Sequence, residues 1–297
     1  MTQSKSRGAK IPDAIARYLE HLKDVTPSGH TFAGYRRDLL CFARWWEETT
    51  GEELSPERVT SVDLREYQEW MRATKGLKPA TINRRMDALR AWLKWAAREG
   101  LAPRVPDFPK PIPQVRQAPQ ALERAEVNRL LRELEKEGDT RDIALVRLLL
   151  SCGLRLSEAV ALKVADVELS ERRGKVTVRR GKGSKWREVP LPPEARKALA
   201  AWLDKHPGGE WLFPGREGDH LSASAAWRVV KKYAWRARIP GLHPHTLRHT
   251  CAYNMLRAGA DIVTVAEVLG HSRLDTTAVY TRPRLADMER ALERGEV

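Results

Sequence analysis

The sequence has only three cysteines in 297 residues, Cys41, Cys152 and Cys251, and they stand far apart. This spacing offers neither a disulfide framework nor a set of zinc ligands, and it favours a reducing, cytoplasmic setting. No apolar run approaches the roughly 18 residues of a membrane-spanning helix. Residues 1–8 are polar and lack the apolar stretch of a secretion signal. Internal repeats and low-complexity stretches are also lacking, so we expect a folded, globular protein.

Positive charge is what the sequence has in excess. Lysine and arginine number 53 against 39 aspartates and glutamates, which gives a net charge of +14. Basic side chains gain affinity for polyanions by releasing counterions from phosphates, so the excess favours a nucleic acid partner. Residues 1–110 and the remainder are both basic, and two basic lobes could clamp a duplex. Charge alone leaves ribosomal and membrane-surface proteins open.

The N-terminal third of the sequence predicts a domain made of helices. Apolar residues recur at helical spacing in four segments, 11–25, 31–48, 61–73 and 79–99. Pro79 suits the first turn of the last helix, because proline lacks only an amide that would be unpaired there. We therefore expect a helical domain over residues 1–102.

Prolines then dominate a short stretch of the sequence, at Pro103, Pro106, Pro109, Pro111, Pro113 and Pro119. Proline at this density cannot continue a helix and favours an extended chain. We interpret residues 103–120 as a linker and residues 121–297 as a second domain.

The sequence of the second domain predicts helices and one small sheet. Two short runs rich in valine, 176–178 and 188–191, indicate strands on either side of a turn at 180–185. Helical patterns occupy 124–136, 141–151, 193–204, 222–236, 246–257, 262–269 and the segment from 276 onward. The expected fold class is mainly α: an N-terminal helical domain and a C-terminal α+β domain of mostly helices with a small antiparallel sheet.

Two arginines stand where they could bind an anion. Arg155 follows the apolar run 143–150, and Glu158, three residues later, is its natural partner. His245 and Arg248 share a face at the start of a helix, where unpaired amides and the helix dipole favour negative charge. A structural ion pair and a buried histidine at a helix start are the open alternatives.

Lys182 lies in the turn between the two expected strands, flanked by glycines that let a backbone approach another group closely. The lysine could reach a DNA groove or a leaving-group oxygen. A solvated turn lysine is the alternative, and Lys185 and Arg187 stand close enough to be confused with it.

His271 and Tyr280 complete the set of reactive groups. His271 follows Gly270, which we expect to cap the end of a helix. Tyr280 alone would be taken for a half-buried core tyrosine. Arginines, histidines and a phenol can together hold a phosphodiester, move protons and attack phosphorus without a metal ion.

The sequence resembles the tyrosine recombinases of the lambda-integrase type and, in length and layout, their Xer-like branch. The resemblance covers roughly residues 11 to 290, and its motifs occur in the order of that family. The matching segments are 153–158, 181–185, 245–249, 269–272 and 276–281, with 31–39 and 81–85 in the N-terminal domain.

The resemblance implies a site-specific DNA recombinase and a role for each group. Tyr280 would attack the scissile phosphate and form a 3′-phosphotyrosyl link with a free 5′-hydroxyl. Arg155 and Arg248 would bind the non-bridging oxygens, with a further hydrogen bond from His271. His245 would accept the tyrosine proton, and Lys182 would protonate the departing 5′-oxygen.

Further expectations follow from the resemblance. Glu158 and His249 would orient these groups, and the arginines would make a metal or other cofactor unnecessary. The partner would be double-stranded DNA, bound by a homo- or hetero-tetramer on two duplexes, in the cytoplasm and on the nucleoid. The residues expected to contact DNA are Thr31, Tyr35, Arg36, Arg37, Asn83, Arg84, Arg85 and Lys185.

Two other functions remain to be weighed. A type IB topoisomerase uses the same nucleophile, but the Xer-like two-domain layout disfavours it. A catalytically silent DNA-binding protein is disfavoured because every catalytic position is filled. The sequence shows no additional arm-binding domain before the helical one, which favours a simple Xer-like role over that of an integrase with an arm.

Overall fold

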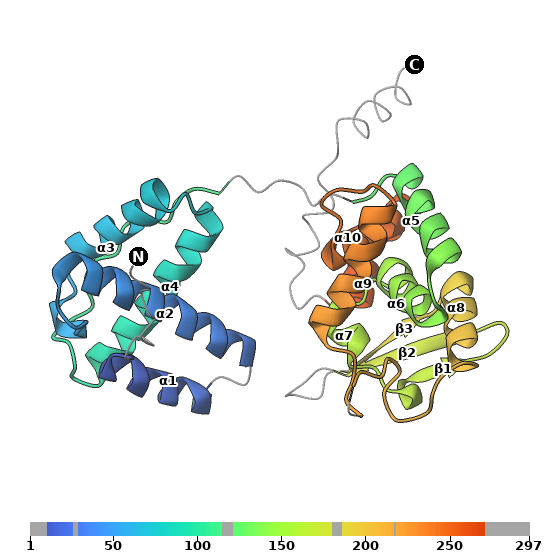
Figure 1. Ribbon diagram of the computed structural model, residues 1–297, viewed down its shortest axis with the longest axis horizontal. Coiled ribbons are helices and arrows are strands. Elements are labelled where there is room, and N and C mark those ends of the chain that lie inside the picture. The colour runs from blue at the N-terminus through green and yellow to red at the C-terminus, as the bar shows by residue number, and fades with distance from the viewer. Residues whose placement is uncertain (1–10, 26–28, 115–120, 180–185, 217, 271–297) are drawn as a thin grey trace, which may run out of the picture. The chain divides into compact units, whose positions relative to one another are not determined.

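The computed structural model of the chain describes residues 11–25, 29–114, 121–179, 186–216 and 218–270. The chain forms two compact units, Met1–Arg116 and Gln117–Val297. The first unit is helical, and the second combines helices with a small antiparallel sheet (Figure 1). The predicted fold class is therefore confirmed.

Helices make up the regular structure of the described part of the first unit. Its α-helices are α1 (Asp13–Val25), α2 (Gly29–Thr50), α3 (Ser61–Glu69) and α4 (Pro79–Arg98). A single 3₁₀ turn, Pro56–Arg58, precedes α3, and a π-helical turn, Trp70–Thr74, follows it. The expected helix over 61–73 is thus α-helical only to Glu69, and the other three segments agree with the prediction.

Aromatic residues dominate the core of the N-terminal unit. Phe42 from α2, Tyr67 from α3 and Trp92 from α4 are fully buried. The Trp92 Nε1 donates to the Ala14 carbonyl at 3.3 Å and so ties α4 to α1. At the start of α3, the Thr60 amide donates to the Asp63 carboxylate at 2.8 Å, which completes a capping box.

Residues 101–112, which we call the strap, lie against this core although they fall largely in the proline-rich stretch. The Asn83 Nδ2 donates to the Ile112 carbonyl, and the Ile112 amide donates to the Asn83 Oδ1, both at 2.9 Å. The guanidinium of Arg90 lies 4.5 Å from the ring centre of Phe108. The strap side chains that pack on the core are Leu101, Val105, Phe108 and Ile112. Side chains of α4 thus supply the partners that a proline-rich backbone cannot supply for itself.

The second unit contains helices and three strands in its described residues. The helices are α5 (Arg124–Glu137), α6 (Thr140–Ser151), α7 (Leu156–Val160), α8 (Pro193–Leu203), α9 (Ala223–Arg236), α10 (Pro244–Arg257) and α11 (Ile262–Leu269). The strands are β1 (Val167–Leu169), β2 (Gly174–Arg179) and β3 (Trp186–Pro190). They form an antiparallel sheet in the order β1-β2-β3, in which Val176 pairs with Val189.

Helix α6 lies at the centre of this unit. Leu145, Leu148 and Leu149 are fully buried, and the helix packs against α5, α7, α8, α9 and α10. A helix that is apolar on most sides needs such neighbours all round. The sheet adds the buried side chains of Val176 and Val189 to the same core. The end of α6 is therefore fixed, and the residues that follow it form part of the candidate site.

A buried hydroxyl on α10 binds the segment through which the chain enters this unit. Thr250 on α10 is fully buried; its Oγ1 accepts a hydrogen bond from the Leu122 amide at 2.9 Å and donates one to the Thr246 carbonyl at 2.8 Å. The hydroxyl thereby joins the segment before α5 to the helix that carries His245 and Arg248.

Within the described residues, no helix is both long enough and apolar enough to cross a membrane.

We expect Thr250→Val to destabilise the C-terminal unit by about 1–3 kcal/mol, because it leaves the buried Leu122 amide without an acceptor. Thermal unfolding of the purified chain measures the loss. Thr250→Ser keeps the hydroxyl and is the matched control. Equal melting temperatures for the valine variant and the parent would contradict the role given to this hydrogen bond.

Candidate active site

A left-handed glycine places Arg155. Gly153 follows α6 and has φ 63°, a conformation that glycine adopts without strain. A Cβ at this position would lie 2.6 Å from the Leu269 Cδ2, so α11 also leaves no room for a side chain. The turn brings Arg155 to the N-cap of α7.

Glu158, in the first turn of α7, holds Arg155 in place. Its carboxylate accepts from the Arg155 amide at 2.9 Å and from the Arg155 Nη1 at 2.8 Å. The predicted ion pair at a spacing of three residues is confirmed. Because the same carboxylate caps the helix and binds the guanidinium, the backbone and side chain of Arg155 are positioned together.

A second arginine, Arg187 on β3, binds the same carboxylate through both of its terminal nitrogens. Its Nη2 donates to the Glu158 Oε2 at 2.8 Å and its Nη1 to the Oε1 at 3.2 Å. Its Nε donates to the Val268 carbonyl at 3.0 Å. Arg187 therefore joins β3, α7 and the end of α11.

Arg248 reaches the cluster from α10. The N-cap of this helix is His243, whose Nδ1 accepts from the Thr246 amide at 3.3 Å. Arg248 is only 3% exposed. Its Nη1 donates to the Gly153 carbonyl at 2.6 Å and its Nη2 to the Leu269 carbonyl at 2.7 Å. The Nη1 also lies 4.0 Å from the Glu158 carboxylate.

Gly270 ends α11, as the sequence predicts for a C-cap, with φ 63° and ψ 49°. Its carbonyl accepts from the Arg155 Nη2 at 3.3 Å. A Cβ on Gly270 would lie 2.6 Å from the Arg187 Nη1. The cap thus brings the segment that precedes His271 against two of the arginines.

Three guanidiniums from α7, β3 and α10 surround one carboxylate, so the cluster carries excess positive charge. Burial by itself would raise the pKa of Glu158. Hydrogen bonds and charge from Arg187 and Arg155 outweigh burial and lower the pKa to about 2. Glu158 is therefore ionised at neutral pH, and the remaining positive charge suits a phosphate.

Two histidines on α10 lie near these arginines. His245 is exposed, and His249, one turn later, is half-buried, with 6.3 Å between the ring centres. Desolvation lowers the pKa of both imidazoles, and neighbouring positive groups, including Arg248, add to the effect. The pKa of His249 falls to about 4. The lowered pKa keeps each ring mostly neutral near pH 7.

The other predicted catalytic residues, Lys182, His271 and Tyr280, lie outside the described residues, as does Lys185. Arg179 ends β2 and pairs with Trp186 at the start of β3, so these two residues flank the segment 180–185, which contains Lys182. The Arg179 Nε donates to the buried Asp166 carboxylate at 2.7 Å, which fixes the end of β2.

The residues predicted to contact DNA in the first part of the N-terminal unit are on α2. Arg36 and Arg37 are exposed, as is Thr31, whereas Tyr35 is half-buried against the core. These two arginines are therefore accessible to a ligand.

The predicted DNA contacts on α4 have partners inside the N-terminal unit. Arg84 forms an ion pair with Asp38, which is 1% exposed, and the Arg85 Nε lies 3.8 Å from the same carboxylate. Asn83 binds the backbone of Ile112 in the strap. At these positions the described contacts are structural.

Arg187 is the participant that the sequence analysis did not place in the site. One signal could have revealed it. Side chains alternate along a strand, and Val189, two residues from Arg187 on β3, is buried. Arg187 therefore points to the inner face, where an arginine requires a carboxylate or carbonyl partner.

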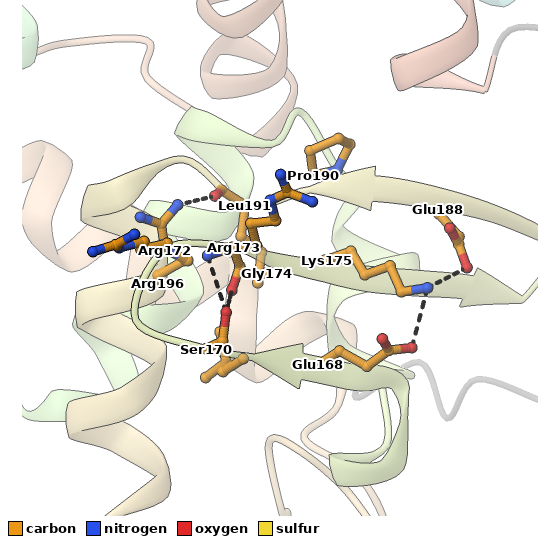
Figure 2. Close-up of a pocket in the computed structure, with 11 residues that line it drawn as sticks. Glu168, Ser170, Arg172, Arg173, Gly174, Lys175, Glu188, Pro190, Leu191 and Arg196 are labelled. Atoms are coloured by element: carbon orange, nitrogen blue, oxygen red, sulfur yellow. Dashed lines mark hydrogen bonds and ion pairs between the residues drawn. The ribbon is translucent and has the colours of Figure 1, made fainter.

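A pocket of about 790 Å³ lies elsewhere in this unit, beside the turn between β1 and β2 (Figure 2). Lys175 on the middle strand reaches Glu188 at 2.8 Å and Glu168 at 3.2 Å, on the strands to either side. Arg196 from α8 donates to the Leu191 carbonyl at 2.9 Å. The residues described as lining this pocket include none that the sequence predicts for catalysis.

Comparison with known families agrees with the two units. Residues 120–286 match the Phage integrase family, and residues 15–100 match the phage integrase N-terminal SAM-like domain. The chain belongs to the phage integrase family. Within that family it is a tyrosine recombinase of the Xer-like branch, an enzyme that cuts and rejoins DNA at specific sites.

Two curated relatives illustrate the branch. Tyrosine recombinase XerC of Xanthomonas campestris pv. campestris (strain B100) is 36% identical over 280 residues, which span 90% of this chain and 83% of the relative. Tyrosine recombinase XerD of Pseudomonas aeruginosa is 35% identical over 289 residues, covering 92% and 95%. Neither a topoisomerase nor a silent DNA-binding protein is favoured by these similarities.

Solved structures share the fold. The XerH site-specific recombinase bound to palindromic difH substrate aligns with a TM-score of 0.75 at 23% identity, covering 95% of this chain and 83% of that one. The lambda integrase(75–356) dimer bound to a COC′ core site aligns with a TM-score of 0.74 at 16% identity, covering 93% and 96%. Identities this low support the fold alone.

The depressed pKa of Glu158 has a consequence for stability. Its contribution is complete above the ordinary pKa of 4.5 and is lost as the pH falls towards 2. We expect Glu158→Gln to cost on the order of 3 kcal/mol near neutral pH, and the difference from the parent to shrink as the pH falls through this window. Chemical denaturation over a pH series measures it, and Glu135→Gln, at an exposed ion pair, is the control. A difference independent of pH would contradict the assigned ionisation.

Proposed function

We propose that the enzyme recombines DNA through a 3′-phosphotyrosyl intermediate, with Tyr280 as the nucleophile. The observation that carries the proposal is the gathering of Arg155 and Arg248 around Glu158, with His245 three residues before Arg248 on α10. In this arrangement a phosphate binder and a proton acceptor lie on the same short helical turn.

Arg155 and Arg248 would bind the non-bridging oxygens of the scissile phosphate. Guanidinium groups match phosphate with paired hydrogen bonds. Both arginines already donate to carbonyl oxygens, at Gly270 for Arg155 and at Gly153 and Leu269 for Arg248. Their orientation is therefore set before DNA arrives. Loss of one such preorganised donor typically costs about 2.7–4 kcal/mol in the transition state.

His245 would take the proton from Tyr280. A tyrosine hydroxyl has a pKa of about 10 and is mostly protonated near neutral pH, so it needs a base. Desolvation and the charges of His243, Arg248 and Arg155 lower the pKa of His245, which keeps its ring neutral and able to accept. His271 would add a hydrogen bond to the phosphate, while Glu158 and His249 orient the neighbouring groups.

Cleavage would form a bond between the Tyr280 oxygen and phosphorus and break the bond from phosphorus to the 5′-oxygen. The tyrosine proton passes to His245, and Lys182 gives a proton to the departing 5′-oxygen. Attack on the phosphotyrosyl link by the 5′-hydroxyl of a second duplex then rejoins the strands. The covalent link preserves the bond energy, so this exchange consumes neither ATP nor water.

The partner in this proposal is double-stranded DNA. The XerH recombinase is bound to its difH substrate and the lambda integrase to a core site in the solved structures, and both units of this chain are basic. Arg36 and Arg37 on α2 would contact the phosphate backbone, as would Lys185, which stands between β2 and β3 in the sequence. Exchange between two duplexes requires four active sites, so we propose a tetramer assembled on DNA, acting at the nucleoid.

Tyr280→Phe tests the nucleophile. The substrate is a pool of DNA duplexes of random sequence, each with a nick beside one potential scissile phosphate. Cleavage at that phosphate releases a short fragment, so the strand cannot be rejoined and the covalent adduct is trapped. We expect the parent to form an adduct that survives denaturation and Tyr280→Phe to form none, as judged by a shift on a denaturing gel. Sequencing the trapped DNA identifies the site. An adduct with the phenylalanine variant would show that another residue is the nucleophile.

Lys182→Ala tests the general acid on the site recovered in that way. We expect the variant to cleave normal DNA slowly and to regain speed on a substrate with sulfur at the 5′-bridging position, because a thiolate leaves without a proton. Single-turnover cleavage rates measure the recovery, with Lys185→Ala as the matched control. Recovery by the Lys185 variant instead would assign the acid to the neighbouring lysine.

A further inference from the structure

We infer that Arg187 is a positioning residue for the cleavage step: it fixes and neutralises Glu158, so that Arg155 and Arg248 keep their hydrogen-bonding capacity for the DNA phosphate. The inference rests on the proposed function of those two arginines. Among the described residues, the Glu158 carboxylate lies within ion-pair distance of all three guanidiniums.

An ionised carboxylate beside phosphate-binding arginines competes with the DNA phosphate for their N–H groups. Carboxylate and phosphate oxygens bind the same N–H groups with similar geometry. Glu158 lies 2.8 Å from the Arg155 Nη1 and 4.0 Å from the Arg248 Nη1. A small rotation of its side chain would draw it onto Arg248. A positively charged group other than Arg155 and Arg248 must therefore hold the Glu158 carboxylate in place.

Arg187 meets this requirement by its contacts. It donates to both oxygens of Glu158, at 2.8 and 3.2 Å, so the plane of the carboxylate is fixed as well as its position. The third donor of Arg187, its Nε, is bound to the Val268 carbonyl at 3.0 Å. This use of the guanidinium differs from that of Arg155, which is one-third exposed, whereas Arg187 is 11% exposed.

Packing holds the Arg187 guanidinium as tightly as its hydrogen bonds do. A Cβ built on Gly270 would lie 2.6, 2.8 and 2.9 Å from its Nη1, Cζ and Nε, so the group lies flat against the glycine backbone. Lysine has one nitrogen and no planar fork, and it could not bind both oxygens of Glu158 and the Val268 carbonyl together. The position therefore requires arginine.

Arg187 also connects parts of the site that are distant in the sequence. It is the second residue of β3, the strand that follows the segment with Lys182 in the sequence, and its partners are on α7 and at the end of α11. The last of these leads into the segment with His271. Loss of Arg187 would loosen the carboxylate that positions Arg155 and the end of α11 at the same time.

The test compares single-turnover cleavage of the trapped nicked site by the full chain and its variants. We expect Arg187→Ala to cleave about 10²-fold more slowly, the cost of a small misplacement of reacting groups, while its affinity for intact DNA stays that of the parent. Arg187→Lys should be impaired as well. Arg147→Ala is the matched control, because Arg147 is 12% exposed and binds Glu135 and Glu194 away from the site.

A double-mutant cycle separates positioning from direct contact with DNA. In a Glu158→Gln background the competing charge is absent, so we expect Arg187→Ala to cause little further loss of cleavage rate. Thermal unfolding of each variant confirms that it is folded, and Arg187→Lys carries the test if the alanine variant is not.

Two results would overturn the inference. In one, the losses from Glu158→Gln and Arg187→Ala multiply, which means that Arg187 acts on the substrate itself. In the other, Arg187→Ala or Arg187→Lys cleaves at the parent rate. Both differ from failure of the proposed function, in which the parent itself forms no covalent adduct.

Discussion

The carboxylate of Glu158 is the group on which the catalytic unit depends. It is largely buried, and a buried charge is tolerated only when it is paired and hydrogen-bonded. Its partners come from three elements: Arg155 at the start of α7, Arg187 on β3 and Arg248 on α10. One anion thus determines where three cations from distant parts of the sequence meet, and the excess positive charge that results is what a phosphodiester requires.

Helix ends supply the rest of the arrangement. Gly153 and Gly270 both adopt the left-handed conformation, and carbonyls at or beside them accept hydrogen bonds from Arg248 and Arg155. Carbonyls at the C-terminal end of a helix carry partial negative charge and favour cations. The ends of α6 and α11 therefore orient the arginines through backbone atoms, which hold a guanidinium rigidly. In this way the fold prepares the site before any substrate is bound.

Local sequence patterns predicted much of the fold and part of the candidate site. Long amphipathic segments became α1, α2 and α4 almost to the residue, and the Arg155–Glu158 pair and the cap at Gly270 follow from spacings of a few residues. Several elements of three to five residues were missed, among them β1 and α7, because so short a stretch has no readable periodicity. The π-helical turn after Glu69 was also missed, since its residues continue the helical pattern.

By itself, the sequence determined which chemical groups are present and their neighbours along the chain, and hence the family. Only the tertiary structure decided that Arg187 binds Glu158, 29 positions away, and that Asn83 binds the strap at Ile112, also 29 positions away. Contacts at such separation depend on how helices and strands pack. A helix or strand repeats its pattern over a few residues, and that repeat carries no information about which distant side chain will complete a buried charge.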